Sequence, residues 1–153
     1  MELNPEWTRH FVQTINDSAY YELLSIKIAE LNWGQARLEI ELQPKHRQAE
    51  GFVHGGVFSG LIDATGFMAV YTGLEQGLGL TTLEMKLNYL APAVEGRLVA
   101  LGRVIKRGKT ISLSEVKVED QDGRLLAHGT VTLMTLPLTS LSGQGNAPPK
   151  FLK

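Results

Sequence analysis

The spacing of apolar residues changes several times along the chain, and each change marks a different predicted element. Trp7, Phe11 and Ile15 recur every four positions, which predicts a short helix over residues 5–15. Between residues 20 and 42, apolar side chains alternate with polar ones on both sides of a short turn, which predicts two strands. This part of the chain is therefore expected to form one helix followed by a β-hairpin.

Residues 55–74 are apolar almost throughout and follow a polar loop over residues 43–53. A run of this length is long enough to cross a hydrocarbon layer, but Asp63 lies at its middle, where an ionised carboxylate is costly in lipid. A helix buried inside a globular protein is the better interpretation. Because this helix is apolar nearly all round, the rest of the chain must cover it on most sides.

The second half of the chain is strand-like. The segment 82–90 alternates apolar and polar side chains, and its expected core face carries Leu83, Met85, Leu87 and Tyr89. Turn residues separate three further predicted strands, over 97–107, 110–119 and 124–136. A curved antiparallel sheet wrapped around the long helix is the economical way to cover it. The prediction is an α+β fold with one domain over 1–136 and a flexible tail over 137–153.

Composition excludes several classes of function. The chain has 153 residues, of which 43% are apolar, and a formal net charge of −1, so bulk charge gives no reason to expect nucleic acid or an anionic membrane as a partner. It has no cysteine, which excludes disulfides and thiolate nucleophiles and fits a reducing compartment. The first 16 residues lack the apolar core of a secretory signal, so a cytoplasmic location is expected. The histidine spacing predicts no metal site.

The polar loop runs through His54, Gly55 and Gly56 directly into the long helix. At a helix start the first backbone N–H groups lack intrahelical partners and the dipole is positive, so these groups can hold a developing oxyanion. The Gly55 N–H is the candidate donor to a thioester carbonyl, with His54 as a second donor. Tight packing at a glycine-rich helix start, with His54 satisfying loop backbone, explains the same residues without a ligand.

Asp63 lies two turns into the apolar helix and is a candidate general base or nucleophile. A structural acid that accepts a hydrogen bond from a loop amide or a threonine hydroxyl explains Asp63 equally well when it is taken alone. The combination with His54 and Gly55 favours catalysis. A triad with Ser59 is rejected, because no Gly-x-Ser-x-Gly nucleophile elbow is present.

Four cations flank the predicted turn at Gly108 and could bind the phosphates of a nucleotide, namely Arg103, Lys106, Arg107 and Lys109. A solvated turn is the plainer interpretation of this charge cluster.

These motifs together resemble the hot-dog acyl-CoA thioesterases of the phenylacetate-degradation type. The resemblance covers residues 20–136 and rests on His54-Gly55-Gly56, Asp63, the segment from Thr81 to Pro92, Gly96, Gly108 and the segment from Asp122 to Ala127. It implies a hot-dog fold, hydrolysis of an acyl-CoA to free acid and CoA, and no cofactor. It also implies assembly as a homodimer or homotetramer, with basic hairpin residues contacting the CoA phosphates.

The resemblance assigns roles residue by residue. Asp63 matches the catalytic acid, Gly55 the backbone oxyanion donor, and His54 a helper to the thioester carbonyl. Gln48 falls where relatives carry Asn or Gln to orient water or the carbonyl, and many close relatives have Asn there. Thr81 falls near a hydroxyl residue that helps to position the attacking water. A hot-dog hydratase or dehydratase and a non-catalytic acyl-CoA binding protein are the alternatives, and the acyl group stays open.

Helix geometry separates two of these candidate groups. Gly55 and Asp63 are eight positions apart, which is about 12 Å along one helix, so one carbonyl carbon cannot meet both in the same chain. Two copies of the helix, antiparallel across a two-fold axis, would place the start of one beside the middle of the other. Small residues that would permit such an approach recur at Gly56, Gly60 and Ala64. The hypothesis is a site that takes Gln48, His54 and Gly55 from one subunit and Asp63 from the other.

Overall fold

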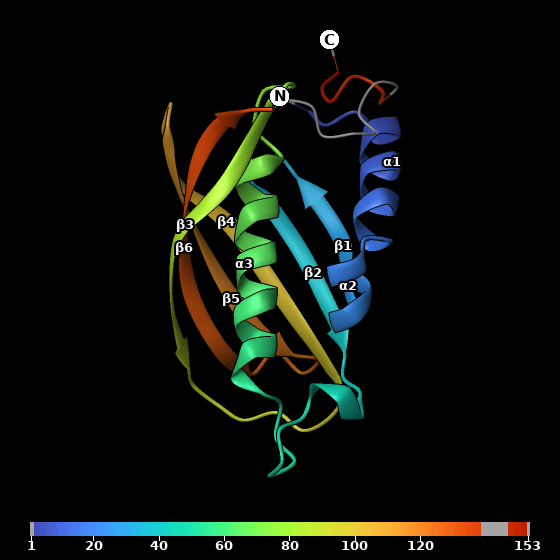
Figure 1. Ribbon diagram of the computed structural model, residues 1–153, viewed down its shortest axis with the longest axis vertical. Helices are drawn as coiled ribbons and strands as arrows, with labels where there is room; N and C mark the ends of the chain where they lie inside the picture. The colour runs from blue at the N-terminus through green and yellow to red at the C-terminus, as the bar shows by residue number, and fades with distance from the viewer. Residues whose placement is uncertain (1, 139–146, 153) are drawn as a thin grey trace.

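One curved antiparallel sheet wraps around one long helix in the computed structural model, which describes residues 2–138 and 147–152 (Figure 1). In chain order the elements are α1 (Pro5–Asn16), α2 (Ala19–Leu24), β1 (Ile26–Asn32), β2 (Gln35–Glu41), the 3₁₀ helix η1 (Pro44–His46), α3 (Gly55–Tyr71), β3 (Leu78–Tyr89), β4 (Arg97–Arg107), β5 (Ile111–Asp120) and β6 (Leu125–Pro137). The six strands lie in the order β1-β2-β4-β5-β6-β3, which leaves β3 at an edge. The predicted α+β hot-dog fold is confirmed.

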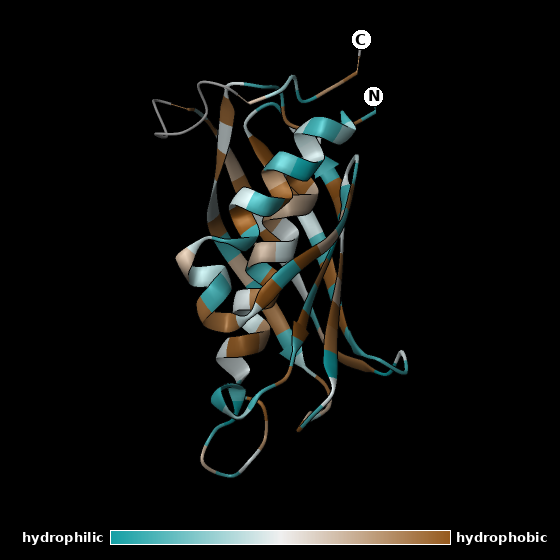
Figure 2. Ribbon diagram, turned by 90° about the vertical axis from the view of Figure 1, so that its right-hand side faces the viewer, coloured by the Kyte–Doolittle hydropathy of each residue, from teal (hydrophilic) through white to brown (hydrophobic). Residues whose placement is uncertain are grey.

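Helix α3 packs directly on the sheet because glycines let the two backbones approach. A Cβ atom on Gly102 of β4 would lie 2.9 Å from the carbonyl oxygen of Thr65 in α3, so no side chain fits there. Leu61 and Ile62 of α3 are fully buried in the core between helix and sheet. The opposite face of α3 is covered at its C-terminal end by α1, as Figure 2 shows from that side.

Helix α1 begins where the sequence predicts, because the Asn4 side chain accepts a hydrogen bond from the Glu6 N–H and Pro5 occupies the first turn. Helix α2 differs from the prediction, which placed strand from residue 20. Ser25 ends α2 in the left-handed conformation, with φ 57°, and turns the chain into β1. A helix of six residues is too short to show a helical period, so the pattern did not reveal it.

Strand β3 contains an irregularity that the alternating pattern does not predict. Its register against β6 shifts between Thr82 and Glu84, so that Leu83 is 53% exposed. Met85 and Leu87 pack against the core as expected. The prediction that Leu83 shares their face is wrong, because the extra residue reverses the alternation on one side of the bulge.

The predicted tail over 137–153 lies partly outside the described residues. At residues 147–152 the chain returns to the fold, where Phe151 forms a β-bridge with Leu3. Lys150 is buried, and its Nζ donates to the carbonyl oxygens of Tyr71 at 2.5 Å and Leu74 at 2.7 Å. This packing differs from the loose order expected for these residues. None of the described helices is long and apolar enough to cross a membrane.

Candidate active site

The start of α3 presents two hydrogen-bond donors. His54 is the N-cap, and its Nδ1 accepts a hydrogen bond from the Gly56 N–H at 2.8 Å. In the neutral ring this acceptor role places the proton on Nε2, which leaves Nε2–H as a donor for a ligand. Within the described residues the Gly55 N–H makes no hydrogen bond. The structure therefore brings the predicted oxyanion donor and its predicted helper together at one helix end.

The loop that carries Gln48 and His54 is held by the buried side chain of His46. His46 Nδ1 accepts from the Gln43 N–H at 2.9 Å, and Nε2 lies 2.8 Å from the Leu24 carbonyl oxygen at the end of α2. The His46 carbonyl in turn accepts from the His54 N–H. Burial lowers the pKa of His46, which favours the neutral ring that this arrangement requires. Sequence reasoning missed this residue, which looked like part of a solvated loop.

Gln48 and Gly55 line the same pocket, with a volume of about 460 Å³. Its wall is largely apolar, with Phe52, Phe58 and Tyr89 among the lining residues. A Cβ atom on Gly55 would lie 3.1 Å from the Tyr89 ring, so this glycine leaves room for the aromatic side chain. Gly55, at the start of α3, therefore lines a pocket that suits the apolar part of a ligand.

Asp63 is half-buried on α3, and its Oδ1 accepts a hydrogen bond from the Thr82 hydroxyl at 2.8 Å. Thr82 pairs with the fully buried Leu133 of β6, which places it on the helix-facing side of the sheet. Thr81 pairs with Met134 and faces the other way. The hydroxyl that contacts the acid in this structure is therefore that of Thr82, and the role of Thr81 in positioning the attacking water stays a prediction.

The two halves of the predicted site lie apart in one chain. Helix α3 is continuous from Gly55 to Asp63, so these residues are separated by about 12 Å along the axis. The sequence predicted a stripe of small residues along which a second copy of the chain could approach α3. At Gly60 this stripe is not free, because Tyr20 and Leu24 of α2 cover it. Strand β3, which carries Thr82, has a free edge in the described structure.

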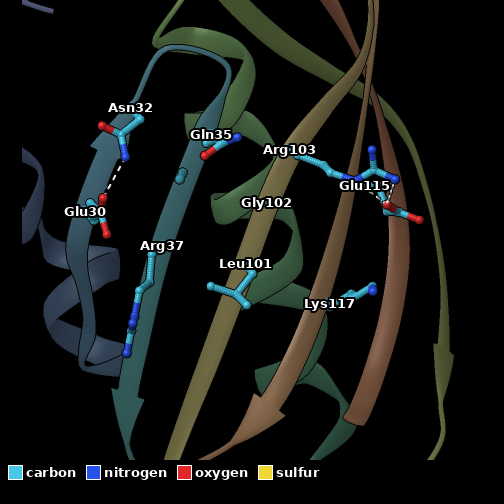
Figure 3. A pocket seen from close by; sticks show the side chains of 10 residues that line it. Glu30, Asn32, Gln35, Arg37, Leu101, Gly102, Arg103, Glu115 and Lys117 are labelled. Carbon is cyan, nitrogen blue, oxygen red and sulfur yellow. Dashed lines mark hydrogen bonds and ion pairs between the residues drawn. The ribbon is translucent and has the colours of Figure 1, made fainter. Parts of the chain in front are cut away.

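The four cations of the β4–β5 hairpin do not share one face. Arg103 forms an ion pair with Glu115, with Nη2 and Oε2 2.6 Å apart. Both residues line a pocket of about 400 Å³. Figure 3 shows that this pocket lies on the face of the sheet opposite α3. Arg107 instead turns inward over the Trp33 ring, 4.4 Å from its centroid. Lys106 and Lys109 are exposed. The four cations therefore do not lie together on a single face, and their contact with the CoA phosphates stays a prediction.

Comparison with known proteins places this fold and helix start in a family. The family model of the thioesterase superfamily matches residues 50–127, which include His54, Gly55, Asp63 and Thr82. The chain belongs to the thioesterase superfamily. This thioesterase is 31% identical over 101 residues to acyl-coenzyme A thioesterase 13 of Homo sapiens, across 65% of this chain and 71% of that protein.

Two further relatives agree. The 1,4-dihydroxy-2-naphthoyl-CoA hydrolase of Listeria monocytogenes is 28% identical over 112 residues, which span 73% of this thioesterase and 91% of the hydrolase. The crystal structure of a thioesterase from Haemophilus influenzae has the same fold, with a TM-score of 0.80 at 22% identity over 86% of this chain and 92% of that one. The protein is therefore a thioester hydrolase.

Proposed function

We propose that this thioesterase, of the phenylacetate-degradation type that its motifs resemble, hydrolyses an acyl-CoA to a free acid and CoA. The observation that carries the proposal is that α3 holds both a possible oxyanion donor and a possible base. The Gly55 N–H at its start makes no hydrogen bond within the described residues, and the Asp63 carboxylate further along is held by Thr82 of β3. The relatives include proteins named for action on acyl-CoA thioesters, which supports CoA as the leaving group.

In the proposed reaction Asp63 acts on the thioester carbonyl carbon in one of two ways. As a general base it takes a proton from water while the water oxygen bonds to that carbon. As a nucleophile it forms an anhydride that water then hydrolyses. In both routes the carbonyl oxygen becomes an oxyanion that accepts hydrogen bonds from Gly55 N–H and His54 Nε2–H. The C–S bond then breaks, and the CoA thiolate takes up the proton that the water loses, so the products are the free acid and CoA. Gln48 lines the same pocket and would orient the water or the carbonyl.

The proposed site is shared between two subunits. About 12 Å separates Gly55 from Asp63 in one chain, whereas a reacting atom should lie roughly 3 Å from each group or one water further. The free edge of β3 offers unpaired backbone groups to a second copy, and Thr82 on that strand holds Asp63. A two-fold dimer, alone or within a tetramer, would form two equivalent sites. The exposed Lys106 and Lys109 remain candidates for the CoA phosphates.

The proposed function is tested with purified protein, a panel of aryl and aliphatic acyl-CoAs and a reagent for free thiol. The wild type should release thiol, and Asp63→Asn should lower kcat by several orders of magnitude because it removes the charge and keeps the shape. Asp17→Asn is the matched control, since Asp17 is exposed at the end of α1 and should not affect the rate. Activity near wild type in Asp63→Asn would remove this carboxylate from the mechanism.

A further inference from the structure

Helix α2 lies against α3 at a position that has no side chain. A Cβ atom on Gly60 would lie 2.6 Å from the Tyr20 hydroxyl and 3.1 Å from Leu24 Cδ1. Figures 1 and 2 show α2 beside the half of α3 that contains its first turns. The glycine therefore lets the tip of Tyr20 rest on the α3 backbone, where any larger residue would push it away.

This contact lies one turn from Asp63. Residues three positions apart on a helix are surface neighbours, so Gly60 and Asp63 share one face of α3. Burial, together with the nearby negative charge of Asp63, raises the pKa of Tyr21, the next residue of α2. Tyr21 belongs to the core, whereas Tyr20 is 53% exposed. Of these two neighbouring tyrosines, Tyr20 is the one that a ligand can reach, and its hydroxyl rests against α3 at Gly60, one turn before Asp63.

We propose that Tyr20 is the side wall of the acyl site and limits the size of the acyl group that can lie next to Asp63. This role rests on the proposed function. The attacking group must lie close to the carbonyl carbon of the substrate, and the acyl group begins at that carbon. The first atoms of the acyl group therefore contact the residues beside Asp63. Gly60 contributes no side chain there. The tip of the Tyr20 side chain rests at the Gly60 position instead and is carried by a separate helix, α2.

The proposal predicts a change in selectivity rather than in chemistry. In Tyr20→Ala the ratio of kcat/KM for a bulky branched or aryl acyl-CoA to that for a short linear one should rise about tenfold or more, the scale on which a pocket separates substrates by size. Tyr20→Trp should lower the ratio, and Tyr20→Phe should keep it because the ring is the wall. Leu23→Ala is the matched control, since Leu23 lies on the same short helix and is 66% exposed. It should leave the ratio unchanged.

A double-mutant cycle with Gly60→Ala tests the contact itself. The added methyl group should displace the Tyr20 hydroxyl and change the acyl ratio in the wild-type background, but it should have no such effect in Tyr20→Ala. Alanine is more favourable than glycine inside a helix, so this variant should fold. Ratios within twofold of wild type in both Tyr20→Ala and Tyr20→Trp, with the wild type active, would overturn only the role of Tyr20. A wild type that releases no thiol would overturn the proposed function and this role together.

Discussion

Replacing Thr82 with valine removes one hydrogen bond from Asp63 and keeps the volume and branching of the side chain. The bond joins the Thr82 hydroxyl to a carboxylate oxygen at 2.8 Å, and hydrogen bonds to charged groups contribute about 1.5–3 kcal/mol. If the transition state loses that whole contribution, the rate falls by roughly tenfold to 150-fold. The expected result is a loss in kcat of this size with KM nearly unchanged, because Thr82 fixes the direction of the carboxylate rather than binding CoA.

The assay is steady-state thiol release from one good acyl-CoA substrate. Thr132→Val is the matched control, because it makes the same chemical change on the neighbouring strand β6, at a residue that pairs with Glu84 on the face of the sheet opposite α3. It should stay within twofold of wild type. In an Asp63→Asn background, Thr82→Val should have no further effect. The reasoning is refuted if Thr82→Val is as active as wild type, or if Thr132→Val loses as much activity.

The remaining predictions concern three cations, Lys150, Lys109 and Arg107. Lys150→Met removes the two hydrogen bonds that Lys150 Nζ donates to backbone carbonyls near the end of α3 and should lower the unfolding free energy by about 2–4 kcal/mol in thermal denaturation. Burial, followed by the charge of Arg107, lowers the pKa of Lys150 from 10.5 to about 7. At a pH between these two values, Lys150 binds a proton in the unfolded chain but not in the native chain. The unfolding free energy of wild type should therefore rise with pH across this window, and an equal rise in Lys150→Met would contradict this assignment. Lys109→Ala should raise KM for acyl-CoA, whereas Arg107→Ala should lower Tm, because that guanidinium packs inward over Trp33. Unchanged KM in Lys109→Ala would mark the lysine as a solvated surface residue.

Local patterns predicted most of the fold. The apolar stretch of α3 and the alternation in the later strands depend only on neighbouring residues, and the structure has both. Helix α2 was missed because six residues do not complete two helical turns. The bulge in β3 has no comparable signature in the sequence, and it alone moves Leu83 out to solvent.

The candidate site also contains some residues that local sequence patterns reveal and others that only the folded structure reveals. Gly55, His54 and Asp63 could be found from the sequence because glycines at a helix start and an acid inside an apolar run are local anomalies. Thr82 and Tyr20 could not, because the contacts on which their proposed roles rest depend on which distant segment lies against α3. The double threonine at positions 81 and 82 was a signal, but only the strand register decides which hydroxyl reaches the carboxylate.

The central claim is that one reaction centre joins Gly55 of one subunit to Asp63 of another, and subunit complementation tests it most directly. An Asp63→Asn chain is mixed with a Gln48→Ala, His54→Ala chain, each nearly inactive alone, under conditions that allow subunits to exchange. In a mixed dimer with shared sites, one site collects every substitution and the other is wholly wild type. Random exchange makes half of the dimers mixed, so about a quarter of wild-type activity should return. No recovery, with mixed dimers demonstrated by native mass spectrometry, would contradict the shared site.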